Sequence, residues 1–237
     1  MRAHRIRIDY GKTVPGDVSI IDTKLPHFSW AVNGVGTSQT GFRLKVLMGD
    51  EGIWDTGWCN STAQSARYGG PELEPGEIYE VLVFVRDETN EAANPARAFF
   101  CLGSLDEWKA PWLCEEEPAQ DAVISFIKDF DIAEEIVSAC LFICGLGYHK
   151  VMLNGEHIFN LPMNPATSQY DERSYYTVLP GLEKRLQKGR NRLGVRVAAG
   201  WRDPNNVCYQ LVNGRIPAFT GKTQMSAMLR LRNKKGE

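Results

Sequence analysis

Short segments in which apolar and polar residues alternate make up most of this chain, and Gly, Pro and Asn residues separate them. Alternation with a period of two is typical of strands that bury one face, and many such strands are typical of β-sandwiches. The expected strands cover residues 5–8, 28–32, 42–48, 78–86, 97–102, 123–130, 138–144, 149–153, 156–159, 192–198 and 226–232. The pattern therefore predicts an all-β protein.

Helical periodicity is weak along the whole sequence. Residues 180–188 begin with Pro, carry Leu182 and Leu186 four positions apart, and are followed by Gly189, which predicts one short helix. Asp131 and Glu134 have the spacing of a helix capping box. The β-branched and aromatic residues that follow them continue into a hairpin, and we therefore interpret residues 137–144 as a strand.

A Pro-broken, acidic stretch over residues 105–118 shows no strand alternation and is typical of a domain boundary. It predicts two β-sandwich domains, at residues 1–106 and 107–237. Each part has an ordinary domain length and is long enough to bury a core of its own.

The first part contains one informative turn. Leu73, Pro75 and Gly76 precede Tyr79, and alternate residues from Tyr79 to Val85 are apolar. A Tyr at such a corner of a sandwich buries its ring and returns its hydroxyl to upstream backbone. The motif resembles fibronectin type III modules, in which it has a structural role.

The second part contains a hairpin signal, Asn154-Gly155, between two apolar segments. Both central residues of a two-residue type I′ turn have positive φ, which Asn and Gly tolerate. Such a turn would pair Leu153 with Glu156 and Met152 with His157. We expect His149 and His157 to be ordinary strand residues, because a zinc site needs about three or four convergent ligands.

The charge balance excludes two classes of partner. There are 27 Lys and Arg residues against 29 Asp and Glu, a formal net charge of −2, and no basic block. We therefore expect neither nucleic acid nor a membrane surface as a partner. No apolar run approaches the roughly 20 residues that span a bilayer. The N-terminus lacks an apolar signal segment, which favours a cytoplasmic protein.

The six cysteines are scattered, without paired spacing and without His at ligand spacing. We interpret them as reduced residues, mostly in the core, rather than as disulfides or a metal site. They are Cys59, Cys101, Cys114, Cys140, Cys144 and Cys208.

Several blocks, in order and over nearly the whole chain, resemble the N-terminal half of glycoside hydrolase family 78, the bacterial α-L-rhamnosidases. In the first part these are PHFSW at 26–30, QTGF at 39–42, WDTG at 54–57 and LEPGEIY at 73–79. In the second part they are WKAPW at 108–112, GLGY at 145–148, LNG at 153–155, YDER at 170–173, YYT at 175–177, GRN at 189–191 and GW at 200–201.

The resemblance implies a fibronectin type III-like module followed by a jelly-roll rhamnosidase N-domain. In that family a helical barrel follows and supplies two glutamates that hydrolyse terminal α-L-rhamnosides with inversion. The residues of this chain do not form that barrel, so we expect no catalytic residue among them. We expect the catalytic barrel of the same protein to be the partner of this region. Residues 225–237 run from a strand into a turn, which suggests a domain truncated at its C-terminus.

The resemblance also implies a rhamnose-containing carbohydrate as ligand, with calcium as a possible bridging ion. Two loops carry the side chains for such a site. The sugar-binding candidates are Tyr170, Asp171, Arg173, Trp201 and Asn205, and the calcium candidates are Asp171, Glu172, Asp203 and Asn206. A Trp or Tyr ring stacks on a sugar face, and calcium binds about six to eight oxygens. The alternative is that these residues only form turns, which their types also favour.

Three functions remain open from the sequence. The chain is the non-catalytic N-terminal part of an α-L-rhamnosidase, or a stand-alone carbohydrate-binding or protein-interaction module, or a small enzyme with an unrecognised site. The third is the weakest, because acidic pairs such as Glu134 and Glu135 lie in polar runs, and no His lies near Cys59 or Ser61 in the sequence.

Overall fold

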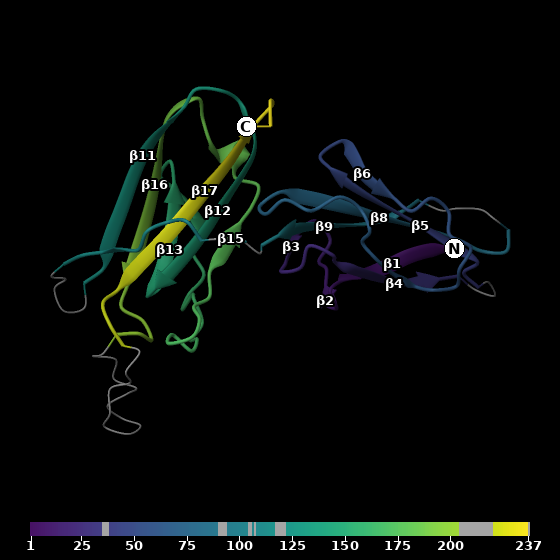
Figure 1. The fold of residues 1–237 in the computed structure, drawn as a ribbon, viewed down its shortest axis with the longest axis horizontal. Coiled ribbons are helices and arrows are strands. Elements are labelled where there is room, and N and C mark those ends of the chain that lie inside the picture. The colour runs from purple at the N-terminus through teal and green to yellow at the C-terminus, as the bar shows by residue number, and fades with distance from the viewer. Residues whose placement is uncertain are drawn as a thin grey trace, which may run out of the picture. The chain divides into compact units, whose positions relative to one another are not determined.

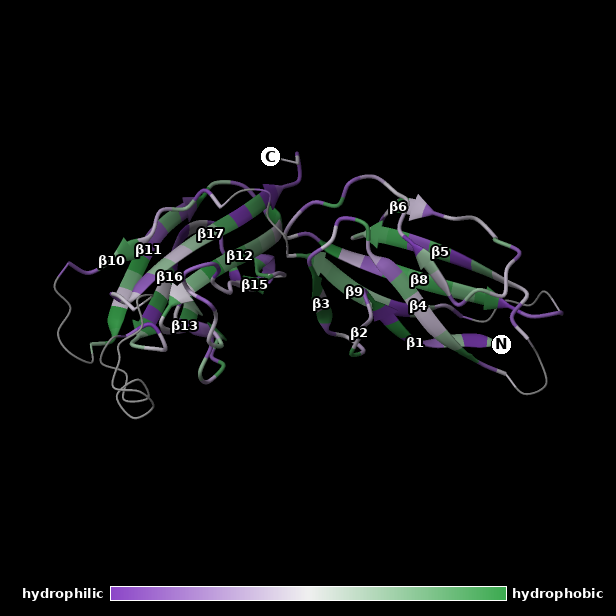
Figure 2. Ribbon diagram, turned by 60° about the horizontal axis from the view of Figure 1, so that its bottom comes forward, coloured by the Kyte–Doolittle hydropathy of each residue, from purple (hydrophilic) through white to green (hydrophobic). Residues whose placement is uncertain are grey.

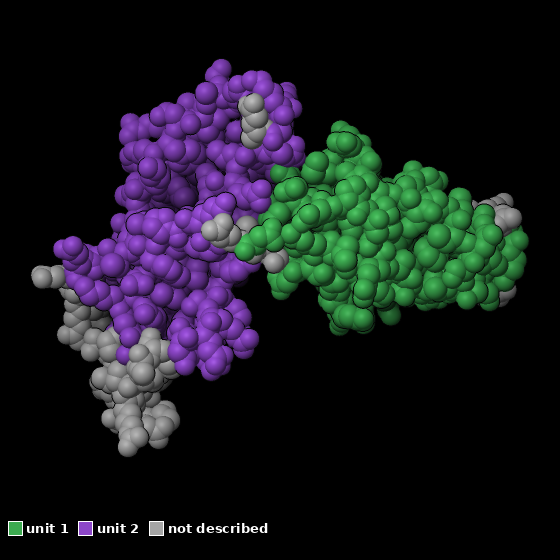
Figure 3. Space-filling view, in the orientation of Figure 1, with its two compact units in different colours: residues 1–106 green, residues 107–237 purple. Residues whose placement is uncertain are grey.

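The computed structural model describes residues 1–34, 38–89, 94–103, 106, 108–116, 122–203 and 220–236. The chain divides into two compact units, Met1–Asp106 and Glu107–Glu237 (Figure 3). Both units are built from β-strands, so the predicted all-β class is confirmed. No helix in the described ranges is long and apolar enough to cross a membrane.

Unit 1 is a sandwich of two sheets (Figure 1). The first sheet has the order β2 (Gly11–Lys12), β1 (Arg2–Ile8), β4 (His27–Asn33) and β7 (Ser65–Arg67). The second has the order β3 (Val18–Ile21), β9 (Ala96–Leu102), β8 (Ile78–Arg86), β5 (Gly41–Met48) and β6 (Glu51–Asp55). Only β3 and β9 run parallel; the other described pairs are antiparallel.

The core of unit 1 follows from the alternation along its central strands, which are mostly hydrophobic (Figure 2). Tyr79 and alternate residues up to Val85 are buried on one face of β8. The Tyr79 ring stacks on Phe100 with 5.4 Å between ring centroids, and its hydroxyl accepts a 2.7 Å hydrogen bond from the backbone N–H of Glu74. The predicted tyrosine corner is therefore confirmed, and it closes the turn onto the core.

Unit 2 is a sandwich of two four-stranded sheets, in which every described strand pair is antiparallel. One sheet has the order β10 (Leu113–Cys114), β17 (Gln224–Asn233), β12 (Ile136–Leu146) and β15 (Thr177–Leu179). The other has the order β11 (Ile124–Ile132), β16 (Gly189–Ala198), β13 (Tyr148–Leu153) and β14 (Glu156–Phe159). Two four-stranded antiparallel sheets are the layout of a jelly roll.

The predicted hairpin is confirmed in turn type and in register. Asn154 and Gly155 have φ of 52° and 86°, and Leu153 lies opposite Glu156 while Met152 lies opposite His157. The Asn154 side chain also accepts a hydrogen bond from the backbone N–H of Arg192, at 2.9 Å. The turn is thus fixed both by its own conformation and by the adjacent strand.

The predicted helix over residues 180–188 is wrong. Only Glu183–Arg185 form a single 3₁₀ turn. The backbone N–H of Leu182 donates to the carbonyl of Ala139 on β12, and Gly181 and Gly189 both have positive φ. The Leu182 hydrogen bond ties the segment to β12, while the N–H groups of Arg185 and Leu186 donate to carbonyls three residues earlier and form the 3₁₀ turn instead of a continued helix. Asp131 lies in β11, and residues 133–135 connect β11 to β12, so the strand interpretation of residues 137–144 is confirmed.

The alternation pattern missed the shortest strands: β2, β3, β6, β7, β10 and β15. β10 lies within the Pro-broken stretch that showed no alternation, and it pairs with β17 over two residues. β2, β7, β10 and β15 have only two or three residues, which are too few to show a period, so the partner strand decides their pairing. β3 and β6, with four and five residues, do not alternate clearly enough to have been predicted.

Candidate carbohydrate-binding site

The strand register places the two loops with the predicted sugar-binding residues at one end of unit 2. Tyr148 lies opposite Ala198, and Thr177 lies opposite Ile143 near the end of β12. The loop that precedes Thr177 and the loop that follows Ala198 therefore leave the sandwich at the same end, which is the lower end of this unit in Figure 1. The Asn154-Gly155 hairpin lies at the opposite end.

The loop over residues 160–176 is anchored to the sandwich by three polar contacts. The backbone N–H of His149 donates to the carbonyl of Asn164 at 3.0 Å, and the Asn164 side chain donates to the hydroxyl of Thr177 at 3.1 Å. The thiol of Cys144 donates to the carbonyl of Tyr175 at 3.3 Å. These contacts fix both ends of the loop on β12, β13 and β15.

The predicted residues Tyr170, Asp171, Glu172 and Arg173 form a turn on this loop. The N–H groups of Glu172 and Arg173 both donate to the carbonyl of Gln169, each at 2.8 Å. The side chains of residues 171–173 are exposed, and Tyr170 is half-buried. The turn thus presents two carboxylates and a guanidinium to solvent, beside a ring that is partly covered.

The second loop presents Trp201 and Asp203. The backbone N–H of Asp203 donates to the carbonyl of Gly200 at 3.1 Å. The Arg202 guanidinium donates to the carbonyl of Lys222 at 3.0 Å, and the N–H of Gly221 donates to the carbonyl of Arg202. Residues 200–203 are thereby tied to the segment that leads into β17. Asn205 and Asn206 lie outside the described residues.

Two glycines allow the backbones to approach closely between these loops. A Cβ atom at Gly147 would collide with the carbonyl oxygen of Ala198, and one at Gly200 would lie 3.2 Å from the Cα of Gly147. The GLGY and GW blocks of the sequence therefore meet in space. Their glycines serve close packing at the end of the sandwich rather than phosphate binding.

The described carboxylates do not form a metal site by themselves. Within the described residues, no group of three or more His, Cys, Asp or Glu side chains lies close enough to hold a metal ion. Asp171, Glu172 and Asp203 therefore do not converge as a preformed calcium site. Any such site needs further oxygens, from Asn206, from backbone carbonyls or from a ligand.

Two titratable groups buried beside the first loop are held in their neutral forms. Burial lowers the pKa of His149, although the nearby backbone of Gly147 opposes this, and the ring stacks on Phe159 with 5.6 Å between centroids. Burial raises the pKa of the Cys144 thiol to about 11. A protonated thiol is a poor nucleophile. His149 lies on β13, as expected for an ordinary strand residue, and the Cys144 thiol donates a hydrogen bond to the loop.

Sequence reasoning missed an aromatic cluster that belongs to this end of the domain. The Trp108 indole N–H donates to the hydroxyl of Ser226 at 2.7 Å, and that hydroxyl donates to the carbonyl of Ala110 at 3.1 Å. The Trp108 ring also packs on Tyr176, with 5.4 Å between centroids. The WKAPW block, interpreted from the sequence as part of a boundary, therefore covers the outer face of β12 and β17.

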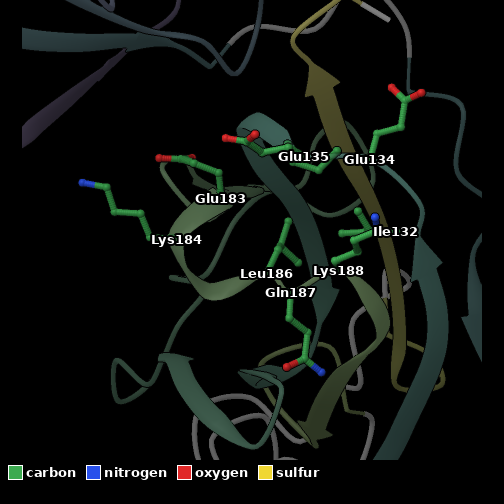
Figure 4. Close-up of a pocket in the computed structure, with 9 residues that line it drawn as sticks. Ile132, Glu134, Glu135, Glu183, Lys184, Leu186, Gln187 and Lys188 are labelled. Atoms are coloured by element: carbon green, nitrogen blue, oxygen red, sulfur yellow. The ribbon is translucent and has the colours of Figure 1, made fainter.

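A separate hollow of about 560 Å³ lies at the opposite end of unit 2, around the β11–β12 connection and the 3₁₀ turn (Figure 4). Its charged residues include Glu134, Glu135 and Glu183. Glu134 is paired with Lys235 at 2.8 Å and Glu135 with Lys234 at 2.6 Å. These side chains are solvated surface ion pairs, which contribute little to stability and do not form a site.

None of the five described cysteines is in a disulfide bond. Cys101, Cys140 and Cys144 are buried, Cys59 is half-buried and Cys114 is exposed. Cys208 lies outside the described residues. The interpretation of the cysteines as mostly core residues holds for those described.

Comparisons with known protein families match both units. Residues 4–106 match a family described as "Rha78A-like, N-terminal immunoglobulin domain", and residues 134–237 match "Alpha-L-rhamnosidase N-terminal domain". The first unit is thus described as immunoglobulin-like rather than fibronectin type III-like. Both names refer to the same kind of two-sheet sandwich.

The curated relatives of this chain are α-L-rhamnosidases. An α-L-rhamnosidase of Formosa agariphila is 29% identical over 221 residues, which cover 78% of this chain and 23% of that protein. An α-L-rhamnosidase of Alteromonas is 28% identical and is covered to 22%. The chain thus spans less than a quarter of the length of these relatives.

The fold of the whole chain is found in solved α-L-rhamnosidases. That of Dictyoglumus thermophilum aligns with a TM-score of 0.72 at 22% identity, and that of Aspergillus terreus with a TM-score of 0.79 at 18% identity. Each alignment covers 100% of this chain and 28% of the other. These structures share the fold of the chain, and the two family models, which match residues 4–106 and 134–237 in this order, show that the chain matches the N-terminal region of the α-L-rhamnosidase family.

Proposed function

We propose that this chain is the non-catalytic N-terminal part of a longer enzyme that hydrolyses terminal α-L-rhamnosides. The observation that carries the proposal is the order of its two domains, each matched to a domain of α-L-rhamnosidases, in a chain that covers 23% of such a relative. The catalytic residues of that enzyme then lie in its remaining part, which is the partner of this region within one polypeptide. An assay of the natural gene product with a panel of aryl glycosides tests the sugar specificity.

We further propose that the loop end of unit 2 binds a rhamnose-containing carbohydrate. Trp201 and Tyr170 supply rings for stacking on the apolar face of a sugar, while Asp171, Arg173 and Asn205 supply hydrogen bonds to hydroxyls. The proposal is supported by the register, which brings the two loops to the same end of the sandwich. It is also supported by the contacts that anchor each loop.

We propose that calcium binds this site only when the sugar is also bound. The described carboxylates do not converge without a ligand. An ion bound by Asp171, Glu172, Asp203 and Asn206 would therefore depend on sugar hydroxyls to complete about six to eight oxygens. The expected behaviour is sugar binding that strengthens with calcium, with no tight calcium binding in the absence of sugar.

Isothermal titration calorimetry with L-rhamnose, in calcium and in a chelator, tests this site. We expect binding at millimolar sugar, and we expect Trp201→Ala to abolish it because the stacking ring is lost. Glu156→Gln is the matched control, because Glu156 lies in the hairpin at the opposite end, where it pairs with Arg185. Absence of heat at millimolar sugar in both buffers would leave these loops a structural role only.

A further inference from the structure

One outer face of unit 1 carries a concentration of basic side chains, which we call the cationic face. It belongs to the sheet β2–β1–β4–β7 (Figure 1). Ala3, Ile6 and Ile8 of β1 are buried in the core, so the basic residues between them point outward. The basic residues of the cationic face are Arg2, Arg5, Arg7, Lys12 and Arg67, and all five are exposed.

The strand register brings these side chains together. Arg7 lies opposite Lys12 on β2 and opposite Ser29 on β4, and Arg67 on β7 lies opposite His27 on β4. Residues that lie opposite each other on antiparallel strands have their side chains on the same face, with Cβ atoms about 5 Å apart. The fold thus collects on one face cations that are separated along the chain and form no basic block in the sequence.

The charges of the cationic face are not neutralised within the described residues, where none of its five side chains forms an ion pair with a carboxylate. Asp9 lies in the adjacent β1–β2 turn, but its Oδ1 atom accepts from the backbone N–H of His27 at 2.8 Å. Arg7 and Lys12 are like charges at directly opposite positions, which destabilises a sheet. An anion bound from outside would remove this repulsion.

The other sheet of unit 1 has cations that are paired. Arg43 and Lys45 of β5 both pair with Asp55, at 2.5 Å and 3.5 Å, and Arg97 of β9 pairs with Glu80 at 3.3 Å. Unit 1 contains 10 Lys and Arg residues against 14 Asp and Glu residues, so carboxylates are in excess. The cationic face therefore lacks carboxylate partners because of where the carboxylates lie, and not because unit 1 has too few of them.

An exposed aromatic ring lies at one end of the cationic face. Tyr10 is 78% exposed, and its ring stacks on His27 with 5.6 Å between centroids and 19° between the ring planes. Asp9 and Tyr10 have φ of 48° and 67°, which suits the two-residue β1–β2 turn but which residues other than glycine rarely adopt. Backbone strain of this kind is concentrated at functional sites. The turn and the stacking hold an aromatic ring in place while most of its surface faces solvent.

The surface between the cations favours an extended ligand. Ser29, Ala31 and Ser65, which lie on the same face of β4 and β7, have small side chains and form a low floor. Arg5 and Arg7 are two positions apart on β1, and a strand rises about 3.3 Å per residue, so they lie on the order of 7 Å apart along it. A polymer with a repeated anionic group matches several cations in a row, whereas a single small anion would use only one or two of them.

We propose that the cationic face binds an acidic polysaccharide, whose carboxylate or sulfate groups pair with the five cations while Tyr10 stacks on a sugar ring. The exposed Tyr10 ring favours a carbohydrate over an acidic peptide, which needs no stacking surface. The excess of carboxylates elsewhere in unit 1 disfavours a nucleic acid duplex, which they would repel. The proposal rests on the proposed function in one respect, that the protein encounters carbohydrate, and it involves none of the loops of unit 2.

Affinity electrophoresis of the 237-residue chain in gels that contain polygalacturonate, dextran sulfate or neutral dextran tests the proposal. We expect at least one of the two charged polymers to bind at least tenfold more tightly than dextran. Binding should weaken as the salt concentration rises from about 0.05 M to about 0.5 M, because the cations are exposed. Binding of polygalacturonate alone would identify the anionic group as a carboxylate, and binding of dextran sulfate alone would identify it as a sulfate. This readout does not depend on hydrolysis, so it fails separately from the proposed enzyme function.

Two double variants locate the binding. Arg5→Asn with Arg7→Gln removes two unpaired charges from the cationic face, and Asn tolerates the positive φ at position 5. We expect this variant to lose at least tenfold in affinity for the charged polysaccharide. Arg43→Gln with Lys45→Gln removes the same number of charges from the other sheet, where Asp55 already pairs with them, and should change the affinity less than twofold.

Poly-L-glutamate distinguishes a carbohydrate from an acidic protein as the ligand. We expect it to bind more weakly than the charged polysaccharide, and we expect Tyr10→Asn to weaken the binding of the polysaccharide but not that of poly-L-glutamate. The proposal would be overturned if neither charged polysaccharide bound, or if the two double variants lost affinity equally. It would also be overturned if poly-L-glutamate or a DNA duplex bound as tightly as the charged polysaccharide.

Discussion

Single side chains determine how the ends of unit 2 are held. Asn191 is almost fully buried, and its amide donates to the carbonyls of Gln187 and Gly189 while its oxygen accepts from Asn154 and from the N–H of Gln187. All of its hydrogen-bonding capacity is thus used between the hairpin and the segment that leads into β16. Nothing in the sequence block GRN distinguishes this residue from an ordinary turn asparagine, because its partners are known only from the fold.

Asn191→Ala should lower the free energy of unfolding of unit 2 by about 2–3 kcal/mol, because it removes these bonds and leaves buried groups without partners. Urea unfolding measures the change. Asn160→Ala, at an exposed loop position, is the control and should be nearly neutral. Equal effects of the two substitutions would show that the Asn191 network does not stabilise the unit.

His149 makes the stability of unit 2 depend on pH. Burial lowers its pKa in the folded state below the ordinary value, so the unfolded chain binds a proton that the folded chain does not. The free energy of unfolding is therefore unaffected by His149 above about pH 6.5, and it decreases as the pH falls toward the pKa of His149 in the folded state.

Urea unfolding at about pH 7.5 and about pH 5 checks this dependence. We expect the loss of stability at the lower pH to be smaller in His149→Phe, which retains an aromatic ring beside Phe159. His157→Phe, on the exposed strand of the hairpin, should behave as the unsubstituted chain. An equal loss of unfolding free energy at the lower pH in the two variants would contradict this role of His149.

At the scale of elements, the long strands could be predicted because their alternation extends over six or more residues. β5 and β8 are examples, and the Asn154-Gly155 turn also predicted the register of β13 and β14. The conformation of residues 180–188 could not be predicted, because the spacing of its two Leu residues fits both a helix and an irregular segment. The hydrogen bond from Leu182 to Ala139 distinguishes the two, and it is known only from the fold. The docking of Trp108 was missed for the same reason, since Ser226 lies far away in the sequence.

Trp108→Ala should lower the free energy of unfolding of unit 2 by about 2 kcal/mol, because a half-buried ring and its hydrogen bond to Ser226 are both lost. Trp112→Ala, four residues further on, removes a ring that is 46% exposed and should have a much smaller effect. Chemical denaturation of the two variants gives the comparison. A larger loss from Trp112→Ala would mean that the WKAPW block is held by its second Trp instead.

At the scale of the whole molecule, the order of the two sandwiches carries more functional information than any single motif. Each sequence block is weak by itself, but the GLGY and GW blocks meet around Gly147 and Gly200, and the LEPGEIY block forms the Tyr79 corner. The family could therefore be predicted from the sequence. The sugar-binding residues remain a prediction, since Asn205 and Asn206 lie outside the described residues and the described carboxylates do not converge.

The central claim is that this chain is the non-catalytic N-terminal region of an α-L-rhamnosidase. Its most direct test is a side-by-side assay of the natural gene product and the 237-residue chain with an aryl α-L-rhamnoside. We predict that the natural product is several times longer and hydrolyses the substrate, and that the 237-residue chain does not. Hydrolysis by the 237-residue chain alone, or a long natural product that cleaves other glycosides but not this one, would contradict the claim.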